Sequence, residues 1–173
     1  MKAKDVRNTI IRMLHEYIKV EVYRSGQVSP EAKIPYITYS VTSPYQPEAT
    51  LGHFETVQEN DETYLYRRER AGMSLSFTAC SQNREKDGER IQGEDEAMEL
   101  AEKVQGWFLH VGRAELSAKG IVVEDVNNVQ SRSVLMIDEE ANRYGFDVIV
   151  RYIRDDRRTV GTVNEVTTKG KKI

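Results

Sequence analysis

Apolar residues recur at steps of three and four between Glu94 and Val111, which is the spacing that lines one face of an α-helix. The apolar face consists of Ala97, Leu100, Ala101, Val104, Trp107, Phe108 and Val111. Acidic residues fill the first turn, where the helix dipole favours negative charge, and Gly112 follows at the position of a C-cap glycine. Because a stripe that ends in Trp107 and Phe108 needs a broad apolar partner, we predict that this helix lies across a sheet.

Further periodic segments predict a second helix and several strands. Residues 5–18 carry apolar side chains at helical spacing and form a short amphipathic helix. Strands are predicted at 20–24, 36–42 and 146–153, and the last is apolar at nearly every position, as in a central strand. Residues 81–93 are charged and contain two glycines, which predicts a loop. This order of elements predicts an α+β domain in which two main helices pack on a mainly antiparallel β-sheet.

A long β-hairpin is predicted between residues 50 and 81, with a polar turn at 59–62. From Met73 onward the second strand alternates between apolar and small polar residues, so this half belongs to the core. The first half carries charge on both faces and therefore has no core to lie on. We expect the tip of the hairpin to project from the body, with a bend or bulge at Gly72.

The length of 173 residues favours one domain that builds its own core. We place this domain at residues 1–155 and expect 156–173 to add an edge strand and a frayed basic tail. Charged residues of both signs are interspersed and the net charge is only -3, so no overall field points to nucleic acid or an anionic membrane. No apolar run approaches the ~20 residues that span a bilayer. The single cysteine, Cys80, agrees with a protein made in a reducing cytoplasm.

Residues capable of catalysis or metal binding form no known motif. The three histidines have no histidine or cysteine partner at metal-ligand spacing, and Cys80 has no histidine nearby in the sequence. The acidic run 138–140 lacks the alternation and the glycine of a calcium loop. Walker A, GxGxxG, GxSxG and HExxH motifs are absent. We therefore expect no enzyme, no cofactor and no metal site; an enzyme would need a cleft assembled from distant residues.

One remaining feature of the hairpin is a run of arginines and tyrosines, called here the arginine–tyrosine segment: Tyr64, Tyr66, Arg67, Arg68 and Arg70. Both residue types are enriched at the centres of protein interfaces. They also suit nucleic acid, because a guanidinium pairs with phosphate and a tyrosine stacks on a base. Acidic residues surround the segment and weaken a nucleic-acid surface, so contact with a protein is favoured. A third interpretation is that the hairpin is solvated and has no partner.

Three ordered segments resemble the neck or tail terminator proteins of tailed bacteriophages and prophages. They are Ile34-Pro35-Tyr36-Ile37, Gly120-Ile121-Val122-Val123 and Arg143-Tyr144-Gly145-Phe146-Asp147. The similarity extends over nearly the whole predicted domain. It implies a small helix-on-sheet subunit that assembles with itself into a ring, commonly a hexamer, on the tail tube. Such a ring stops tail polymerisation and offers the surface on which the head connector docks.

The resemblance also implies partners and a location, and it carries no catalytic residues. The partners are the tail tube protein, the head connector and DNA that passes through the lumen without sequence-specific binding. The protein is then assembled in the cytoplasm of a bacterial host and ends in the neck of the virion. The arginine–tyrosine segment becomes a candidate for the contact between subunits or for the ring lumen. The alternatives are another adaptor ring of the neck or tail tube, and a nucleic-acid-binding module that uses this segment.

Overall fold

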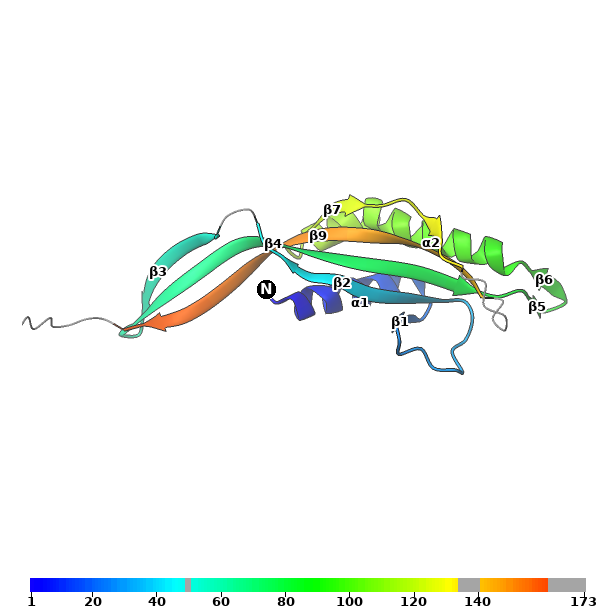
Figure 1. Ribbon diagram of the computed structural model, residues 1–173, viewed down its shortest axis with the longest axis horizontal. Helices are drawn as coiled ribbons and strands as arrows, with labels where there is room; N and C mark the ends of the chain where they lie inside the picture. Colours follow the sequence, from blue (N-terminus) through cyan, green and yellow to red (C-terminus); the bar gives the residue numbers. More distant parts are fainter. Residues whose placement is uncertain (49–50, 134–140, 162–173) are drawn as a thin grey trace, which may run out of the picture.

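The computed structural model describes residues 1–48, 51–133 and 141–161 (Figure 1). In these ranges one seven-stranded sheet carries helices on one of its faces, and a small two-stranded sheet stands apart. The helices are α1 (Ala3–Ile18), α2 (Gly93–Leu109) and α3 (Val111–Ser117). The strands are β1 (Val22–Arg24), β2 (Tyr36–Gln46), β3 (His53–Glu59), β4 (Glu62–Ser81), β5 (Arg84–Lys86), β6 (Glu89–Ile91), β7 (Ile121–Val126), β8 (Gln130–Ser131) and β9 (Asn142–Val160).

The large sheet is built on two long antiparallel strands, β4 and β9. They pair without a register shift from Thr63 opposite Val160 to Ser81 opposite Asn142. In the body of the molecule the strand order is β1-β2-β4-β9-β7, and only the pairing of β1 with β2 is parallel among the described strands. The predicted α+β class with a mainly antiparallel sheet is therefore confirmed.

The core lies between the helices and the sheet face that they cover. Alternate residues of β4 from Ala71 to Ala79 point to this face and are buried, as the pleat of a strand requires. Both rings at the end of α2 are buried, and the ring centroids of Phe77 and Phe108 lie 5.1 Å apart. Burial of one such side chain contributes about 1.5–3 kcal/mol. The prediction that this helix lies across the sheet is confirmed.

The end of α2 differs from the prediction. The helix ends at Leu109, and Val111 begins the short helix α3. Gly112 lies inside α3 and is therefore not the C-cap of α2. It packs against the indole of Trp107. A Cβ at this position would come within 2.3 Å of the ring carbon Cε2 of Trp107. A glycine is therefore needed here for the close approach of α3 to α2.

Strand boundaries also differ, because polar residues extend strands beyond their apolar parts. β2 continues through Pro44 to Gln46, past the part that pairs with β1, so the missing N–H of the proline costs no ladder bond on that edge. The predicted loop at 81–93 contains the β5–β6 hairpin. β9 extends from 142 to 160, beyond the predicted strand at both ends.

Other predictions near these strands have mixed outcomes. The register between β2 and β4 shifts between Ser43 and Gln46, and Gln46 lies opposite Gly72, where an irregularity was predicted. β9 passes residue 155 without a break, and the division of the chain there stays a prediction. The acidic run 138–140 and residues 162–173 lie outside the described residues.

Candidate functional site

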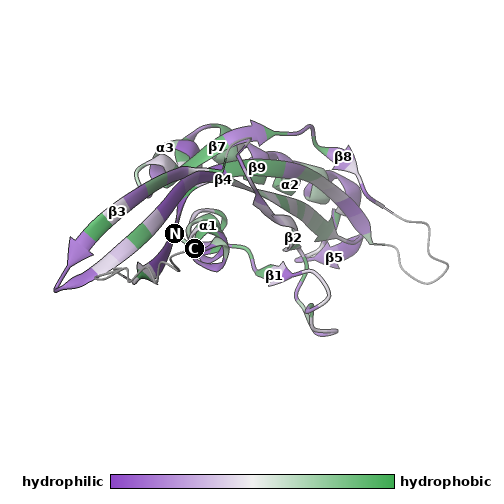
Figure 2. Cartoon of the chain, turned by 60° about the vertical axis from the view of Figure 1, so that its left-hand side comes forward, coloured by the Kyte–Doolittle hydropathy of each residue, from purple (hydrophilic) through white to green (hydrophobic). Residues whose placement is uncertain are grey.

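The large sheet continues past the body as a three-stranded arm (Figure 1). The arm consists of β3, residues 62–69 of β4 and residues 154–160 of β9. β4 is its central strand, and the helices lie against the body rather than the arm. Figure 2 shows mainly hydrophilic colours along the arm and a mixture with hydrophobic colours in the body. The arm therefore exposes both of its faces in the described part of the chain.

Two residues at the tip of the arm form the turn between β3 and β4. Asn60 and Asp61 have φ values of 47° and 66°, and the strands begin to pair at Glu59 and Glu62. Two central residues with positive φ are typical of the type I′ turn, whose twist matches that of a β-hairpin. Asn and Asp tolerate this left-handed conformation better than most residues. The sequence of the turn thus favours the observed register.

The arginine–tyrosine segment does not form one surface, because side chains alternate along β4. Arg67 points to the side that continues the helix-covered face of the sheet. Tyr64, Tyr66, Arg68 and Arg70 point to the opposite side, called here the open face. The segment thus divides into one residue on the first side and four on the second.

Arg67 is bound at the base of the arm. Its guanidinium donates hydrogen bonds of 2.9 and 2.7 Å to the carboxylate of Glu69 and one of 3.3 Å to Asp156. It also donates a hydrogen bond of 2.7 Å to the carbonyl oxygen of Leu51. Glu69 is only 3% exposed and accepts a further hydrogen bond of 2.6 Å from the hydroxyl of Tyr45. Arg67 therefore joins three segments of the chain where the arm meets the body.

Arg68 is paired on the open face. Its Nε donates a hydrogen bond of 2.8 Å to Asp155, which lies opposite it on β9. Hydrogen bonding to this carboxylate raises the pKa of the arginine above its usual value. Both side chains are partly exposed to solvent, so the pair orders the arm without contributing much stability. Its main effect is to neutralise the charge of Arg68.

Both tyrosines of the segment make contacts within the arm. The hydroxyl of Tyr66 donates a hydrogen bond of 3.0 Å to Glu59. Tyr64 donates to Glu62, and this hydrogen bond raises the pKa of the tyrosine. The guanidinium of Arg157 lies 4.4 Å from the centroid of the Tyr64 ring. The phenol groups therefore hold the arm's strands and turn together.

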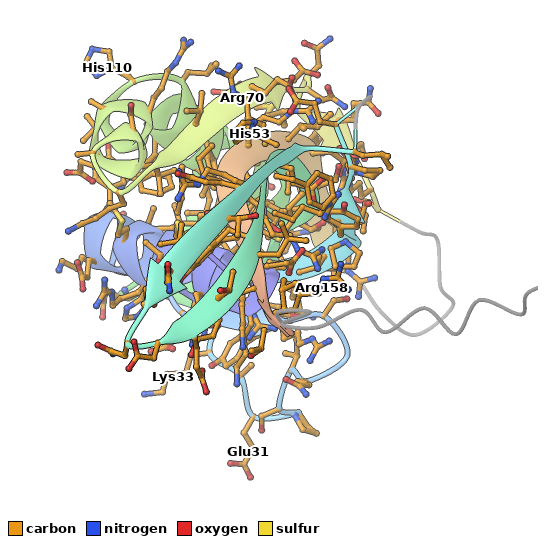
Figure 3. All side chains as sticks on the ribbon, turned by 90° about the vertical axis from the view of Figure 1, so that its left-hand side faces the viewer. Glu31, Lys33, His53, Arg70, His110 and Arg158 are labelled. Atoms are coloured by element: carbon orange, nitrogen blue, oxygen red, sulfur yellow. The ribbon has the colours of Figure 1, made fainter. Side chains whose placement is uncertain are left out.

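Arg70 differs from the other members of the segment. It is exposed (Figure 3), and in the described ranges it makes no hydrogen bond or ion pair. Its neighbour across the strands is Ile153, which is 41% exposed on the same open face. Val122 lies near them at the edge of the body and is 52% exposed. Arg70 is thus the member of the segment that no described residue pairs with.

Oppositely charged residues at the arm base were missed in the sequence. The register places Arg67 opposite Asp156, Arg68 opposite Asp155 and Glu69 opposite Arg154. Each position on β4 therefore faces the opposite charge on β9. The signal was present as two matching runs, Arg67-Arg68-Glu69 and Arg154-Asp155-Asp156, read in antiparallel order.

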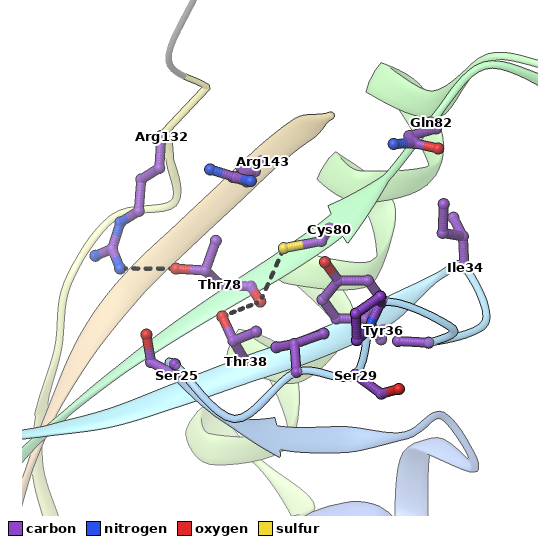
Figure 4. A pocket seen from close by; sticks show the side chains of 14 residues that line it. Ser25, Ser29, Ile34, Tyr36, Thr38, Thr78, Cys80, Gln82, Arg132 and Arg143 are labelled. Atoms are coloured by element: carbon purple, nitrogen blue, oxygen red, sulfur yellow. Dashed lines mark hydrogen bonds between the residues drawn. The ribbon is translucent and has the colours of Figure 1, made fainter. Parts of the chain in front are cut away.

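A hollow of about 720 Å³ lies on the open face of the body, beside residues 25–34 (Figure 4). Arg132 reaches it but is bound to Asp147 at 2.8 Å and to the hydroxyl of Thr78 at 3.1 Å. Burial raises the pKa of the Cys80 thiol, which disfavours the reactive thiolate. The side chain of Cys80 is buried, as expected of a structural residue.

No group of three histidine, cysteine, aspartate or glutamate residues is placed to hold a metal ion in the part of the chain that the structure describes. The histidines of the chain lie apart: His15 is on α1, His53 begins β3, and His110 separates α2 from α3. Among the described helices, none is long and apolar enough to cross a membrane.

Comparison with known proteins identifies one family. The profile of a family described as phage neck terminator protein matches residues 8–173. The match covers nearly the entire chain and includes the body and the arm. No curated protein matches the chain.

Proposed function

Because the chain belongs to the phage neck terminator protein family and has a structural role in the neck or tail of a phage particle, we propose that it forms a ring that caps the tail tube. The ring consists of copies of this chain, six being the expected number. It stops tail polymerisation and provides the surface for joining the head. The observation that carries this proposal is the arm, a sheet extension that the subunit's own helices leave uncovered.

An uncovered three-stranded arm is the kind of element that a neighbouring molecule stabilises. Exposed apolar side chains lie at its base, since Phe54 on β3 is 50% exposed and Leu51, just before β3, is 78% exposed. Exposed apolar groups on a projecting element are typical of an interaction site. In a closed ring, each subunit presents one surface to the next by the same rotation. A projecting arm suits such a head-to-tail contact.

The outer edge of the arm supports assembly into a closed structure rather than a fibre. Residues 154–160 of β9 pair with β4 on one side and with no described strand on the other. All five residues after Ile153, from Arg154 to Arg158, are charged, and they alternate between the two faces of this edge strand. Charged edge strands discourage uncontrolled strand addition. The expected contact is therefore selective and made by side chains.

We further infer that the chain is a structural protein and not an enzyme, because its family is structural. The proposed partners are the tail tube protein and the head connector, with assembly in the cytoplasm of the bacterial host. DNA passes through the lumen without sequence-specific binding. Pairing of Arg67 and Arg68 with carboxylates supports this, since a neutralised surface lets DNA slide. The same pairing argues against a nucleic-acid-binding module built on the arginine–tyrosine segment.

Deletion of the gene from a phage or prophage that carries it tests the proposed function. Electron microscopy of the lysates should show filled heads beside unattached tails, some of which are overlong. Normal joined virions with tails of normal length would contradict the proposal. Free heads with tails of normal length would favour another adaptor ring of the neck, and labelling the wild-type protein in the particle would locate it.

A further inference from the structure

The tip of the arm and the first half of α1 carry opposite net charge. Residues 48–66 contain five acidic residues and no lysine or arginine. Four of the acidic residues lie on the β3–β4 hairpin of the arm: Glu55, Glu59, Asp61 and Glu62. Residues 2–12, which include the first half of α1, contain four cations and one acid. The cations are Lys2, Lys4, Arg7 and Arg12.

Lys2 precedes α1 and is exposed, Lys4 and Arg12 lie on the exposed side of the helix, and Arg7 is half-buried at the border of the core-facing stripe. Val6, Ile10 and Leu14 are fully buried, whereas Lys4 and Arg12 are exposed. Positions 4, 8 and 12 share one face of a helix. In the described ranges no carboxylate forms an ion pair with a lysine or arginine of this face. The basic face, defined as Lys2, Lys4, Arg7 and Arg12, therefore forms no ion pair within the described ranges, and Asp5 is the one acid among residues 2–12.

The acids of the hairpin are also available to a partner. Glu55 and Asp61 are exposed, and no hydrogen bond to either side chain is found among the described residues. Glu59 and Glu62 accept hydrogen bonds from tyrosine hydroxyls, which leave the negative charge in place. Arg157 offsets part of it, at 3.7 Å from Glu59. The hairpin stays acidic overall.

The two surfaces do not meet within one subunit. The hairpin extends away from the body, and its tip lies beyond the N-terminal end of α1 (Figures 1 and 2). The surfaces do have similar lengths. Residues 55–60 of an extended strand span about 16 Å at ~3.3 Å per residue. Residues 2–12 span about 15 Å where they are helical, at ~1.5 Å per residue.

We propose that the acidic hairpin of one subunit lies along the basic face of α1 in the next copy of the chain. The inference rests on the proposed ring and specifies its contact. Each subunit supplies one acidic hairpin and one basic helix face. The two kinds of surface are therefore equal in number in a closed ring of any size. Charge complementarity of this kind guides encounter and fixes register. A second copy is favoured over another partner because both complementary surfaces belong to the same chain.

Two charge-reversed variants test the contact. The arm variant is Glu55→Lys with Asp61→Lys, two positions at which reversal spares the hydrogen bonds of the tyrosines. The helix variant is Lys4→Glu with Arg12→Glu. Under conditions in which the wild-type chain assembles, native mass spectrometry should show that each variant alone loses assembly. An equimolar mixture should assemble, because the basic arm of one variant then meets the acidic helix of the other, and the two should alternate in the ring.

A matched control makes the same charge change elsewhere. Glu99 and Glu102 are exposed on α2, outside both surfaces, so Glu99→Lys with Glu102→Lys should assemble as the wild type does. Loss of assembly in this control would overturn the proposal, because assembly would then depend on the total charge of the subunit and not on the position of the charges. Melting temperatures of the helix variant and the control should match that of the wild type, and that of the arm variant should be slightly lower, because a lysine at position 61 is strained at positive φ. A fold retained at the assay temperature separates loss of contact from loss of fold.

Complementation in cells provides a second readout. A phage lacking the gene should yield joined particles with both variants expressed together and not with either alone. Wild-type assembly by each variant alone, or a mixture that fails in both assays, would overturn the contact and leave the ring in place. A wild-type chain that is a single copy both in solution and in the particle would overturn the ring itself. A helix variant that assembles but no longer binds duplex DNA would assign the basic face to nucleic acid.

Discussion

The same two strands behave differently in the body and in the arm. β4 and β9 pair from one end of the molecule to the other without a register shift. In the body their alternate side chains are apolar and lie under helices, as at Phe77 and Phe146. In the arm most of the corresponding positions are charged or polar, Leu65 and Val160 being the exceptions, and no helix lies above them. Backbone pairing thus carries the sheet throughout, and the side chains decide whether the subunit or another molecule covers it.

The largest effect should come from the body. Phe77→Ala removes a buried ring that contacts Phe108 and Phe146, and should lower the free energy of unfolding by about 3–5 kcal/mol. Phe54→Ala on the arm is the matched control, since Phe54 is half exposed, and it should change stability little. Urea denaturation followed by circular dichroism measures both. Equal losses in the two variants would contradict the comparison.

The base of the arm should respond to loss of its buried carboxylate. Glu69→Ala removes the acceptor of hydrogen bonds from Arg67 and Tyr45, and we expect a loss of about 1.5–3 kcal/mol. Glu55→Ala, an exposed acid on the same arm, serves as the control. Thermal melting compares the two variants. If Glu69→Ala has the same melting temperature as the control Glu55→Ala, the contacts of Glu69 do not hold the arm to the body.

Close packing between α2 and α3 gives a third prediction. Gly112→Ala places a Cβ against the indole of Trp107 and should cost about 1–3 kcal/mol. Gly106→Ala within α2 meets open space and should stabilise the protein by up to about 1 kcal/mol. Both changes add one methyl group to a helix of the body. A similar effect of the two on unfolding in urea would contradict the role of Gly112.

A smaller effect of pH is expected at the start of α2. The hydrogen bond from Arg84 lowers the pKa of Glu96, and Ser81 adds a second hydrogen bond. Since the folded pKa lies below the unfolded value of about 4.3, this stabilisation is complete above that value and is lost as the pH falls through the folded pKa. Between pH 6 and 3 the melting temperature of the wild type should fall more than that of Glu96→Gln. Parallel curves would show that the pair contributes nothing.

The smallest effect on stability should come from Arg70. Arg70→Ala removes an exposed side chain without an ion pair in the described ranges, so the melting temperature should not change measurably. Under the proposed function, the fraction of assembled subunits or of joined particles should nevertheless fall. Sedimentation velocity and particle counts provide the two readouts. A destabilised Arg70→Ala protein would show that this residue supports the fold.

Much of the body could be predicted from the sequence, because burial imposes a period on it. The apolar stripe of α2 and the alternation from Met73 onward identify both layers of the core. Gly112 gave no such signal, since its role depends on how closely two helices approach. The β5–β6 hairpin was missed because its strands have no apolar period.

The arm could be predicted only in part, because its contacts join distant segments. Arg67 and Asp156 are 89 positions apart, and only the register of β4 with β9 brings them together. The end of β9 has the composition of a solvated tail and was therefore predicted as a separate edge strand. The basic face of α1 was also overlooked, because exposed cations on an amphipathic helix are ordinary. Its proposed role follows only when its charge is compared with that of the acidic hairpin.

Hydrogen exchange in the isolated subunit and in the assembled state tests the central claim most directly. Amides of the β3–β4 hairpin of the arm, at 53–66, should exchange rapidly in the isolated subunit and more slowly after assembly. Amides at 71–81 of β4 should exchange slowly in both states, because the helices already cover them. An arm as protected as the body in the isolated subunit, or one unchanged by assembly, would contradict the claim that the arm is completed by another molecule.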